Sequence, residues 1–520
     1  MLVKIKISGM TCPDCANANV KSLLQSKAVV SANGDFAKGV IWAYVTELKE
    51  NDVAAAVKSA GYGYEGYEKI EELSYDIAIV GGGSAAFAAA IYAAEAGKRV
   101  AVIEKDIIGG TCLNRGCVPT KHLLDVTAGQ GRKYHISALI DRKNSLLSEL
   151  RQMKYYSILD SYENIHSWSG IAEFRDSTSI EVDKNFIIRF TGAIIATGAR
   201  PKIAHFPGLE KVKYYTTREM LQLKEIPKKL VILGGRASAL EFAQIYIQLG
   251  SEVTVLQRSE RIAPNEEHAI SEKLKEYMLA AGVNIFTGTK VTGIDKKSVY
   301  FEHEGAKKEA DYTHLLVATG RQPNTDGMGL ENVGVAVDEK GFIKVDEFYR
   351  TNAENIYAAG DCIGKEMLVT TAAKEGRLAA RNFLESTKLT VSYEFVPHAI
   401  FTAPEVASVG LKEADAIAEG YEVETRILPM SSVPRALAML DDRGIVKMVA
   451  DKKTHKVLGV HILALHASEI IHQAVLILRQ GMTLEDVIDK LDVYPTLSEA
   501  VKLCALSFFK DVNKLSCCSD

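Results

Sequence analysis

The sequence predicts a multidomain α/β fold, because three patterns follow one another along its 520 residues. Residues 1–67 alternate short strands and helices in the order βαββαβ. Twice after residue 75, an apolar strand runs into a glycine turn, a helix and a second strand, which is a parallel βαβ unit. From about residue 391, shorter strands and helices mix, as in an α+β domain.

The composition excludes some classes of protein. The chain is 47% hydrophobic and 25% charged, with a net charge of −4, so nothing indicates a nucleic-acid partner. No apolar run reaches the ~18 residues of a membrane span. Residues 2–7 read as a strand and not as a signal peptide, which predicts a cytoplasmic protein whose thiols stay reduced.

The first 67 residues predict a ferredoxin-like module. Its expected elements are a strand at 2–8, a helix at 13–26, strands at 28–31 and 40–45, a helix at 52–60 and a strand from Tyr64. The charged segment 68–74 is predicted to be a linker.

The first βαβ unit, in a domain predicted at 75–221, has the pattern of a Rossmann-like dinucleotide site. Gly81 permits the tight turn, and Gly83 lets the backbone approach a pyrophosphate at the helix N-terminus. Ala86 is small enough for close helix packing. Glu104 ends the second strand, where an acid binds a ribose hydroxyl.

The second unit, in a domain predicted at 222–336, begins with Gly234 but has Arg236 where a second motif glycine is expected. Its second strand ends in Gln257 and Arg258, with Arg261 nearby, and lacks a ribose-binding acid. A neutral residue with arginines suits a 2′-phosphate, so the sequence favours NADPH over NADH.

Six of the eight cysteines form three pairs. Cys517 and Cys518 are adjacent thiols, which close no long loop but can clamp a soft metal. Cys112 and Cys117 enter a helix, whose N-terminus lowers a thiol pKa, so they can act as a dithiol or disulfide beside a flavin. With Cys12-x-x-Cys15, these pairs predict a thiol relay for a soft metal.

The segment Gly109–Lys121 resembles the redox-active motif of the flavoprotein disulfide reductases, and the resemblance extends over residues 75–520. It implies a second part of the FAD domain at 337–390 and a dimerisation domain at 391–520. It further implies that Cys117 touches the flavin, that Cys112 is the exchange thiol, and that Lys121 pairs with Glu241. The residues implied to line FAD are Ala86, Thr111, Lys121, Ala172, Asp361 and Val369.

One departure points to a branch of this family. The disulfide reductases carry a histidine near the C-terminus as acid–base, whereas this chain has Tyr494, followed by the retained Glu499. A phenol with an ordinary pKa of about 10 shuttles protons poorly at neutral pH. Together with Tyr155 and Cys517–Cys518, this is similar to the members that reduce Hg(II) to Hg(0) with NADPH.

The segment Gly9–Cys15 resembles heavy-metal-associated domains, which implies two-sulfur binding of Hg(II) by Cys12 and Cys15. Tyr62 either closes that metal loop or is a packed aromatic residue. The implied route takes Hg(II) from its thiol complexes through Cys12/Cys15 and Cys517/Cys518 to Cys112/Cys117. The resemblance also implies a homodimer in which the C-terminal tail serves the partner's site.

Two alternatives stay open from the sequence. The chain could be a disulfide reductase with a fused metal-binding domain, or a non-catalytic carrier of soft metals. The carrier is disfavoured by the Cys112/Cys117 motif and by two nucleotide-binding units, and the disulfide reductase by Tyr494.

Overall fold

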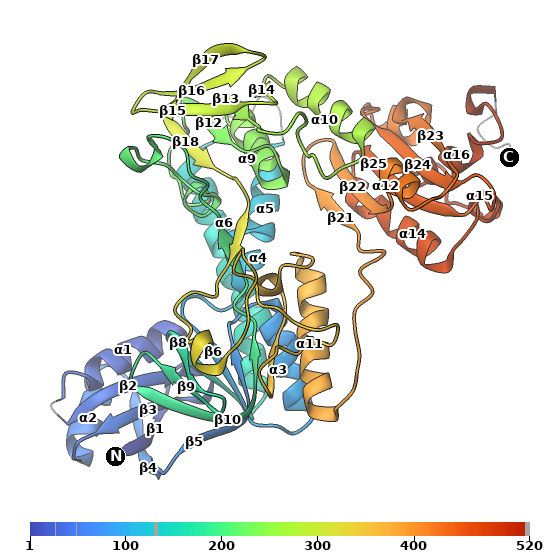
Figure 1. The fold of residues 1–520 in the computed structure, drawn as a ribbon. Helices are drawn as coiled ribbons and strands as arrows, with labels where there is room; N and C mark the ends of the chain where they lie inside the picture. Colours follow the sequence, from blue (N-terminus) through green and yellow to red (C-terminus); the bar gives the residue numbers. More distant parts are fainter. Residues whose placement is uncertain (27, 48, 129–133, 515–520) are drawn as a thin grey trace. The chain divides into compact units, whose positions relative to one another are not determined.

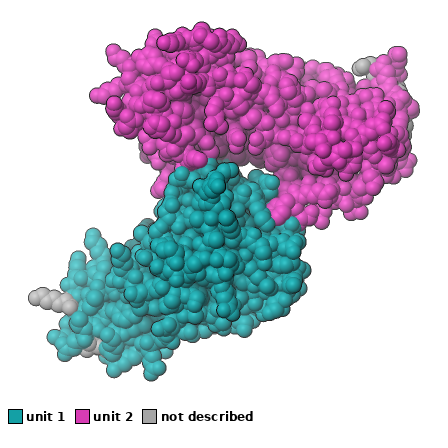
Figure 2. Space-filling model, in the orientation of Figure 1, with its two compact units in different colours: residues 1–118, 144–200, 321–391 teal, residues 119–143, 201–320, 392–520 magenta. Residues whose placement is uncertain are grey.

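The computed structural model describes residues 1–26, 28–47, 49–128 and 134–514 (Figure 1). The chain forms two compact units, coloured in Figure 2. Unit 1 contains residues 1–118, 144–200 and 321–391, and unit 2 contains residues 119–143, 201–320 and 392–520. Among the described residues, no helix is both long enough and apolar enough to span a bilayer.

The N-terminal module of unit 1 has the predicted βαββαβ order, with a four-stranded antiparallel sheet in the order β2-β3-β1-β4. Its apolar core includes Ile5, Leu23, Ile41 and Val57. The helix expected at 13–26 ends at Leu23, and the strand expected at 28–31 continues to Asp35 because it pairs with β3 over its length. The elements are β1 Leu2–Ser8, α1 Pro13–Leu23, β2 Val29–Asp35, β3 Val40–Val45, α2 Glu50–Ser59 and β4 Gly63–Ile70.

The segment expected to be a linker is largely strand. β4 continues to Ile70, which pairs with Leu2 of β1, and β5 (Leu73–Val80) begins almost at once. Only Glu71 and Glu72 separate the two strands. The charged side chains at 68–72 do not prevent pairing, because backbone groups form the ladder.

A second sheet in unit 1 carries the first nucleotide motif, with strand order β7-β6-β5-β10-β9-β8 and β20 paired with β10. Strands β5, β6 and β7 are parallel, as the sequence predicts for a βαβ unit. Helices α3 (Ser84–Glu95) and α11 (Val369–Glu385) pack closely, since a Cβ on Gly376 would lie 2.0 Å from Ala85 O. The other strands are β6 Val100–Glu104, β7 Ile165–Ser169, β8 Ala172–Asp176, β9 Ser179–Val182, β10 Phe186–Ile195 and β20 Ile356–Ala358.

A series of helices follows β6. They are α4 Gly110–Arg115, α5 Cys117–Thr127, α6 Ile136–Arg151, a π-helix at Gln152–Tyr156 and α7 Ser157–Ser161. The two short strands where the chain passes between the units are β11 Ala199–Pro201 and β19 Arg321–Pro323.

Unit 2 contains the second nucleotide unit, a parallel sheet in the order β14-β13-β12-β18. Its elements are α8 Thr217–Met220, β12 Lys229–Leu233, α9 Ala237–Gln248, β13 Glu252–Leu256, α10 His268–Ala280, β14 Asn284–Phe286 and β18 His314–Val317. A three-stranded antiparallel sheet is formed by β15 Lys290–Ile294, β16 Ser298–His303 and β17 Ala306–Asp311.

The last part of unit 2 is the α+β domain, with a five-stranded antiparallel sheet in the order β21-β22-β25-β24-β23. Buried Lys447 of β24 donates to Glu267, 2.7 Å away, just before α10, which ties this sheet to the second nucleotide unit. The elements are β21 His398–Ile400, β22 Glu405–Gly410, α12 Glu413–Ala418, β23 Val423–Pro429, α13 Pro434–Ala438, β24 Ile445–Asp451, β25 Val457–Ala464, α14 Ala467–Gln480, α15 Leu484–Asp489 and α16 Glu499–Leu506.

Candidate active site and cysteine pairs

The first nucleotide motif forms a turn that only glycine can make. Gly81 has φ +120°, and a Cβ there would lie 2.3 Å from Ala196 O. Gly83 caps α3 with extended backbone, so the first-turn N–H groups of this helix can face an anion. A Cβ on Gly110 would lie 2.7 Å from Gly83 Cα, so the strand–helix turn and the loop before Cys112 pack backbone to backbone.

Glu104 closes this turn from the end of β6. Its carboxylate accepts from Gly82 N at 2.7 Å and from Asp106 N at 2.8 Å. Burial raises the pKa of Glu104, and these two backbone hydrogen bonds oppose the rise. The acid therefore lies where the sequence predicts a ribose-binding group, although its role stays a prediction.

Unit 1 also holds buried polar atoms that suit a large polar cofactor. Among the described residues, Thr197 Oγ1 and Arg321 Nε are buried without a hydrogen-bond partner. Arg321 pairs with Asp361 at 3.2 Å, and burial raises the pKa of this carboxyl. Unpartnered buried groups are uncommon and suggest a missing ligand, so the turn, the acid and these atoms fit FAD.

The other residues expected to line FAD lie on the elements around this turn. Ala86 is fully buried in α3, and Ala172 is buried at the start of β8. Thr111 is in α4, and Val369 is the first residue of α11.

The redox-type cysteines lie at successive helix starts. Cys112 is half-buried in α4, and Cys117 is exposed as the first residue of α5. Between them, buried Asn114 donates to Gly110 O at 3.0 Å and accepts from Arg151 Nε at 3.1 Å. The sequence reading missed Asn114, although an amide between two paired cysteines is a signal of a loop anchor.

Tyr155 is near this loop. It lies in the π-helix Gln152–Tyr156, a local irregularity often found at functional sites. Its ring packs edge-on against Phe87 at 4.7 Å, and a Cβ on Gly109, the residue capping α4, would lie 3.5 Å from it. Burial raises the pKa of Tyr155, the Ser84 hydroxyl lowers it, and the nearby Cys112 raises it further.

Lys121 and Glu241 are brought together within unit 2. Lys121 Nζ donates to both carboxylate oxygens of buried Glu241, at 2.9 and 3.0 Å. Phe401 N also donates to Glu241 at 3.0 Å, and the lysine ammonium lies 4.4 Å from the Phe401 ring. The expected ion pair is therefore present.

The second nucleotide unit repeats the first turn. Gly234 has φ +119°, and a Cβ there would lie 2.3 Å from Ala318 O. Gln257 is buried at the position of the acid, and Arg258 beside it is exposed. Among the described residues, Arg261 Nη1 is buried without a partner, which fits an anionic ligand such as a 2′-phosphate.

The C-terminal candidates lie partly outside the described residues. Tyr494 is 46% exposed. Glu499 begins α16, and burial together with the nearby Asp492 raises the pKa of its carboxyl. Cys517 and Cys518 are outside the described residues.

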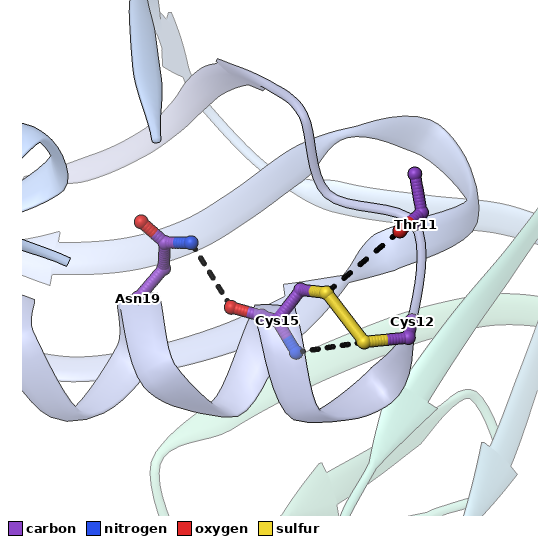
Figure 3. Close-up of a disulfide and its surroundings, with 4 residues drawn as sticks. All are labelled: Thr11, Cys12, Cys15 and Asn19. Atoms are coloured by element: carbon purple, nitrogen blue, oxygen red, sulfur yellow. Dashed lines mark hydrogen bonds between the residues drawn. A yellow bond between two sulfur atoms is a disulfide. The ribbon is translucent and has the colours of Figure 1, made fainter. Parts of the chain in front are cut away.

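Cys12 and Cys15 form a disulfide at the start of α1 (Figure 3). Cys12 caps the helix, and its sulfur accepts from Cys15 N at 3.3 Å. Thr11 Oγ1 lies 3.9 Å from Cys15 Sγ, and Tyr62 packs against the module core and within 3.7 Å of a Cβ built on Gly9. Once reduced, the pair would present two thiols at a helix N-terminus.

The remaining cysteines are structural. Cys362 and Cys504 are fully buried, and burial raises the pKa of each thiol to about 12. In the part of the chain that the structure describes, no three His, Cys, Asp or Glu side chains are grouped to hold a metal ion.

Comparison with known proteins agrees with this geometry. The pyridine nucleotide-disulphide oxidoreductase model matches residues 75–376, and the dimerisation-domain model of the same group matches residues 396–505. A mercuric reductase of Lysinibacillus sphaericus is 37% identical, and one of Staphylococcus aureus is 36% identical, each with 99% of both chains aligned. The solved structure of the HOCl-induced flavoprotein disulfide reductase RclA from Escherichia coli covers 84% of this chain and all of its own, with 32% identity and a TM-score of 0.78.

Proposed function

The chain belongs to the pyridine nucleotide-disulphide oxidoreductase family, and from this premise we propose that it reduces Hg(II) to Hg(0) with NADPH. NADPH gives up two electrons to become NADP⁺ and a proton, and Hg(II) takes the two electrons. The observation that carries the proposal is the end-to-end similarity to mercuric reductases, which includes the N-terminal module. Tyr494, where disulfide reductases have a histidine, supports the same substrate.

We assign the two nucleotides to the two glycine turns. FAD would be held by Gly81, Gly83, Glu104 and Asp361 of unit 1, and when bound it supplies two-electron transfer between nicotinamide and thiols or metal. NADPH would be held by Gly234, Arg258 and Arg261. The Lys121–Glu241 pair keeps a cation on α5, one helical turn after Cys117.

Cys112 and Cys117 are the proposed metal ligands at the reaction centre. The helix starts at which they lie favour the thiolate, the form that binds a soft metal. Between them, Asn114 of α4 is held by hydrogen bonds to Gly110 O and from Arg151 Nε. Tyr155 and Tyr494 are proposed to line the site, and the raised pKa of Tyr155 keeps its phenol protonated and uncharged at neutral pH.

The other two cysteine pairs are proposed to deliver the metal. An incoming thiolate binds Hg(II) and displaces the thiolate that carried it, so passage between pairs never releases a free ion. Cys12/Cys15 would accept it first, then Cys517/Cys518, then Cys112/Cys117. With the dimerisation domain at 396–505, we propose a homodimer in which the tail pair serves the partner's site, working in the cytoplasm.

The decisive experiment supplies Hg(II) as a bis-thiol complex, follows NADPH oxidation at its absorbance band and traps elemental mercury. Wild-type protein should consume one NADPH per mercury atom released, and Cys112→Ala/Cys117→Ala should release none. NADPH oxidation with oxidised glutathione or lipoamide but not with Hg(II) would instead identify a disulfide reductase. Mercury binding without any NADPH oxidation would identify a metal carrier.

The tail has a separate test. Cys517→Ala/Cys518→Ala should leave the melting temperature unchanged, because adjacent cysteines close no stabilising loop. Its turnover of the bis-thiol complex should fall, since an entering thiolate is lost. Equal turnover by the double variant and wild type would remove the tail from the route.

A further inference from the structure

Within unit 1, the N-terminal module binds the outer strand β7 of the sheet that carries the first nucleotide motif. β7 is an outer strand, so its free edge carries unpaired backbone groups. Asp35 of β2 accepts from Ser167 N and Ser167 Oγ, both at 3.0 Å. Two residues earlier, Asn33 accepts from Ser169 N at 3.3 Å and donates to Ser169 O at 2.5 Å. Because the spacing matches, side chains of the module form hydrogen bonds with backbone groups at this edge, as the backbone of a further strand would.

A second contact holds the end of a helix. Lys38 Nζ donates to Leu159 O and to Tyr162 O, both at 2.7 Å, at the C-terminal end of α7. The last carbonyls of a helix lack intrahelical partners and attract a cation. The module also packs on β7, where Trp42 stacks on Trp168 with ring centroids 5.6 Å apart and both side chains buried.

A third contact reaches the π-helix that carries Tyr155. Phe36 of the module packs edge-on against Tyr156 at 4.8 Å, and Tyr156 lies against the module core. Tyr155, the preceding residue, packs on Phe87 instead, and its ring lies 3.5 Å from a Cβ built on Gly109, before Cys112. Two adjacent residues of the π-helix therefore face different partners. Tyr156 faces the module, and Tyr155 faces the turn before Cys112.

We propose that the docked module is a positioning element: through Lys38 and Phe36 it fixes residues 152–161 and thereby holds Tyr155 beside the Cys112 loop. The inference rests on the proposed function only for the role of Tyr155. Two kinds of contact fix the segment, the Lys38 ammonium on its carbonyls and the Phe36 ring on Tyr156, while Asp35 and Asn33 hold the neighbouring strand β7. In a relay, the module would thus serve the reaction centre even when its own cysteines carry no metal.

Hydrogen–deuterium exchange of the full-length holoenzyme tests the positioning directly. Lys38→Met keeps the aliphatic stem and removes the charge, and the same change at Lys58, an exposed residue of α2, is the matched control. Peptides covering 152–162 should exchange at least about 10-fold faster in Lys38→Met, because the loss of even one charge-assisted hydrogen bond has about this effect. The control should match wild type. Equal exchange in the two variants would overturn the proposal.

A kinetic cycle tests the connection to Tyr155. With Hg(II) bis-thiol complex, Lys38→Met should lower kcat about 10-fold, within the ~100-fold that a 1 Å misplacement can cost. In a Tyr155→Phe background, the same substitution should change kcat no more than Lys58→Met does. An undiminished effect of Lys38→Met in that background would show that the module does not act through Tyr155, and would overturn the proposal.

The two readouts separate the possible failures. If wild type oxidises no NADPH with Hg(II), the proposed function fails, and the exchange measurement alone decides whether the module fixes residues 152–162. If wild type is active but exchange is unaffected by Lys38→Met, the positioning inference fails and the proposed function stands.

Discussion

The glycine turns of the two nucleotide units have the same backbone geometry and differ in the side chains placed on it. Gly81 and Gly234 have φ values of +120° and +119°, and at each a Cβ would lie 2.3 Å from a carbonyl oxygen. The backbone after these glycines also agrees, since Gly83 and Arg236 both cap their helices with extended conformation. Backbone geometry thus predicts that each unit takes a nucleotide.

The side chains predict which nucleotide each unit takes. In the first unit, Glu104 accepts from Gly82 N at 2.7 Å, whereas in the second Gln257 is directed to Ser259. Arg236 has a negative φ of −97°, so its backbone is unstrained. Its side chain occupies space at the N-terminus of α9 that a glycine would leave open. The comparison teaches that cofactor identity depends on a few side chains that the turn itself does not constrain.

The largest expected effects come from breaking the shared turn. Gly81→Ala should yield protein without bound flavin, and Gly234→Ala should keep flavin but lose reduction by NADPH. A positive φ costs ~1–2 kcal/mol and overpacking ~1–3 kcal/mol, so each change costs ~2–5 kcal/mol locally. Flavin absorbance of the purified proteins and stopped-flow reduction by NADPH measure the two effects.

Matched controls exist at the other end of each helix. Gly97 and Gly250 also have positive φ, +75° and +95°, but a Cβ there would meet nothing within 4 Å. Gly97→Ala and Gly250→Ala should therefore keep both cofactors at a modest cost in stability. Loss of flavin from Gly97→Ala as well would show that strain alone, and not the carbonyl contact, explains Gly81.

The next effect concerns the arginines of the second unit. Arg258→Ala should reduce the NADPH/NADH ratio of kcat/KM by about 10- to 150-fold, because a charge-assisted phosphate contact contributes ~1.5–3 kcal/mol. Lys105 follows Glu104 as Arg258 follows Gln257, so Lys105→Ala is the control and should leave the ratio unchanged. An unaltered ratio in Arg258→Ala would refute the assignment of the 2′-phosphate.

A smaller effect should follow from giving the second unit the acid of the first. Gln257→Glu places a carboxylate where the 2′-phosphate is proposed to bind. NADPH KM should rise about 10-fold, which corresponds to ~1.4 kcal/mol of repulsion, while NADH KM should fall or stay constant. Steady-state kinetics with both nucleotides measure this, and a parallel change in both KM values would contradict it.

The smallest effect is a pH dependence that only the first unit should show. Burial raises the pKa of Glu104, so flavin-free native protein binds this proton more tightly than the unfolded chain does. Its contribution to stability is fully present below the ordinary glutamate pKa and is lost as pH rises through the raised pKa. Glu104→Gln should make the melting temperature depend less on pH in that window. Gln257→Ala removes no titrating group, so it should leave the pH dependence of the melting temperature as it is in wild type.

Much of this fold was predictable because its signals are local. Both predicted βαβ units are present, with β6 ending at Glu104 and β12 running into the Gly234 turn, since apolar runs and glycine turns define them. The family and its dimerisation domain are confirmed by the comparisons. The Lys121–Glu241 pair was expected from resemblance alone, as no spacing rule joins residues so far apart in sequence.

The rest depended on tertiary contacts that leave no local pattern. The charged residues at 68–72 suggest a linker, yet strand β4 extends to Ile70, because its backbone pairs with β1. Asn33, Asp35 and Lys38 read as ordinary polar residues of a small module, and only the assembled unit 1 shows what they bind. The π-helix at 152–156 was likewise invisible, because its sequence reads as continuous helix.

The two-residue connection between β4 and β5 has a consequence for how metal can travel. Two residues span at most about 7 Å, so the connection gives the N-terminal thiols little freedom to move through solution. A domain on a long flexible linker searches at millimolar effective concentration, with the linker setting the encounter rate. Because the connection is short, a partner in the proposed thiol exchange would have to reach Cys12 and Cys15 where the docked module holds them. Glycines inserted into the connection would let these two thiols search a larger volume.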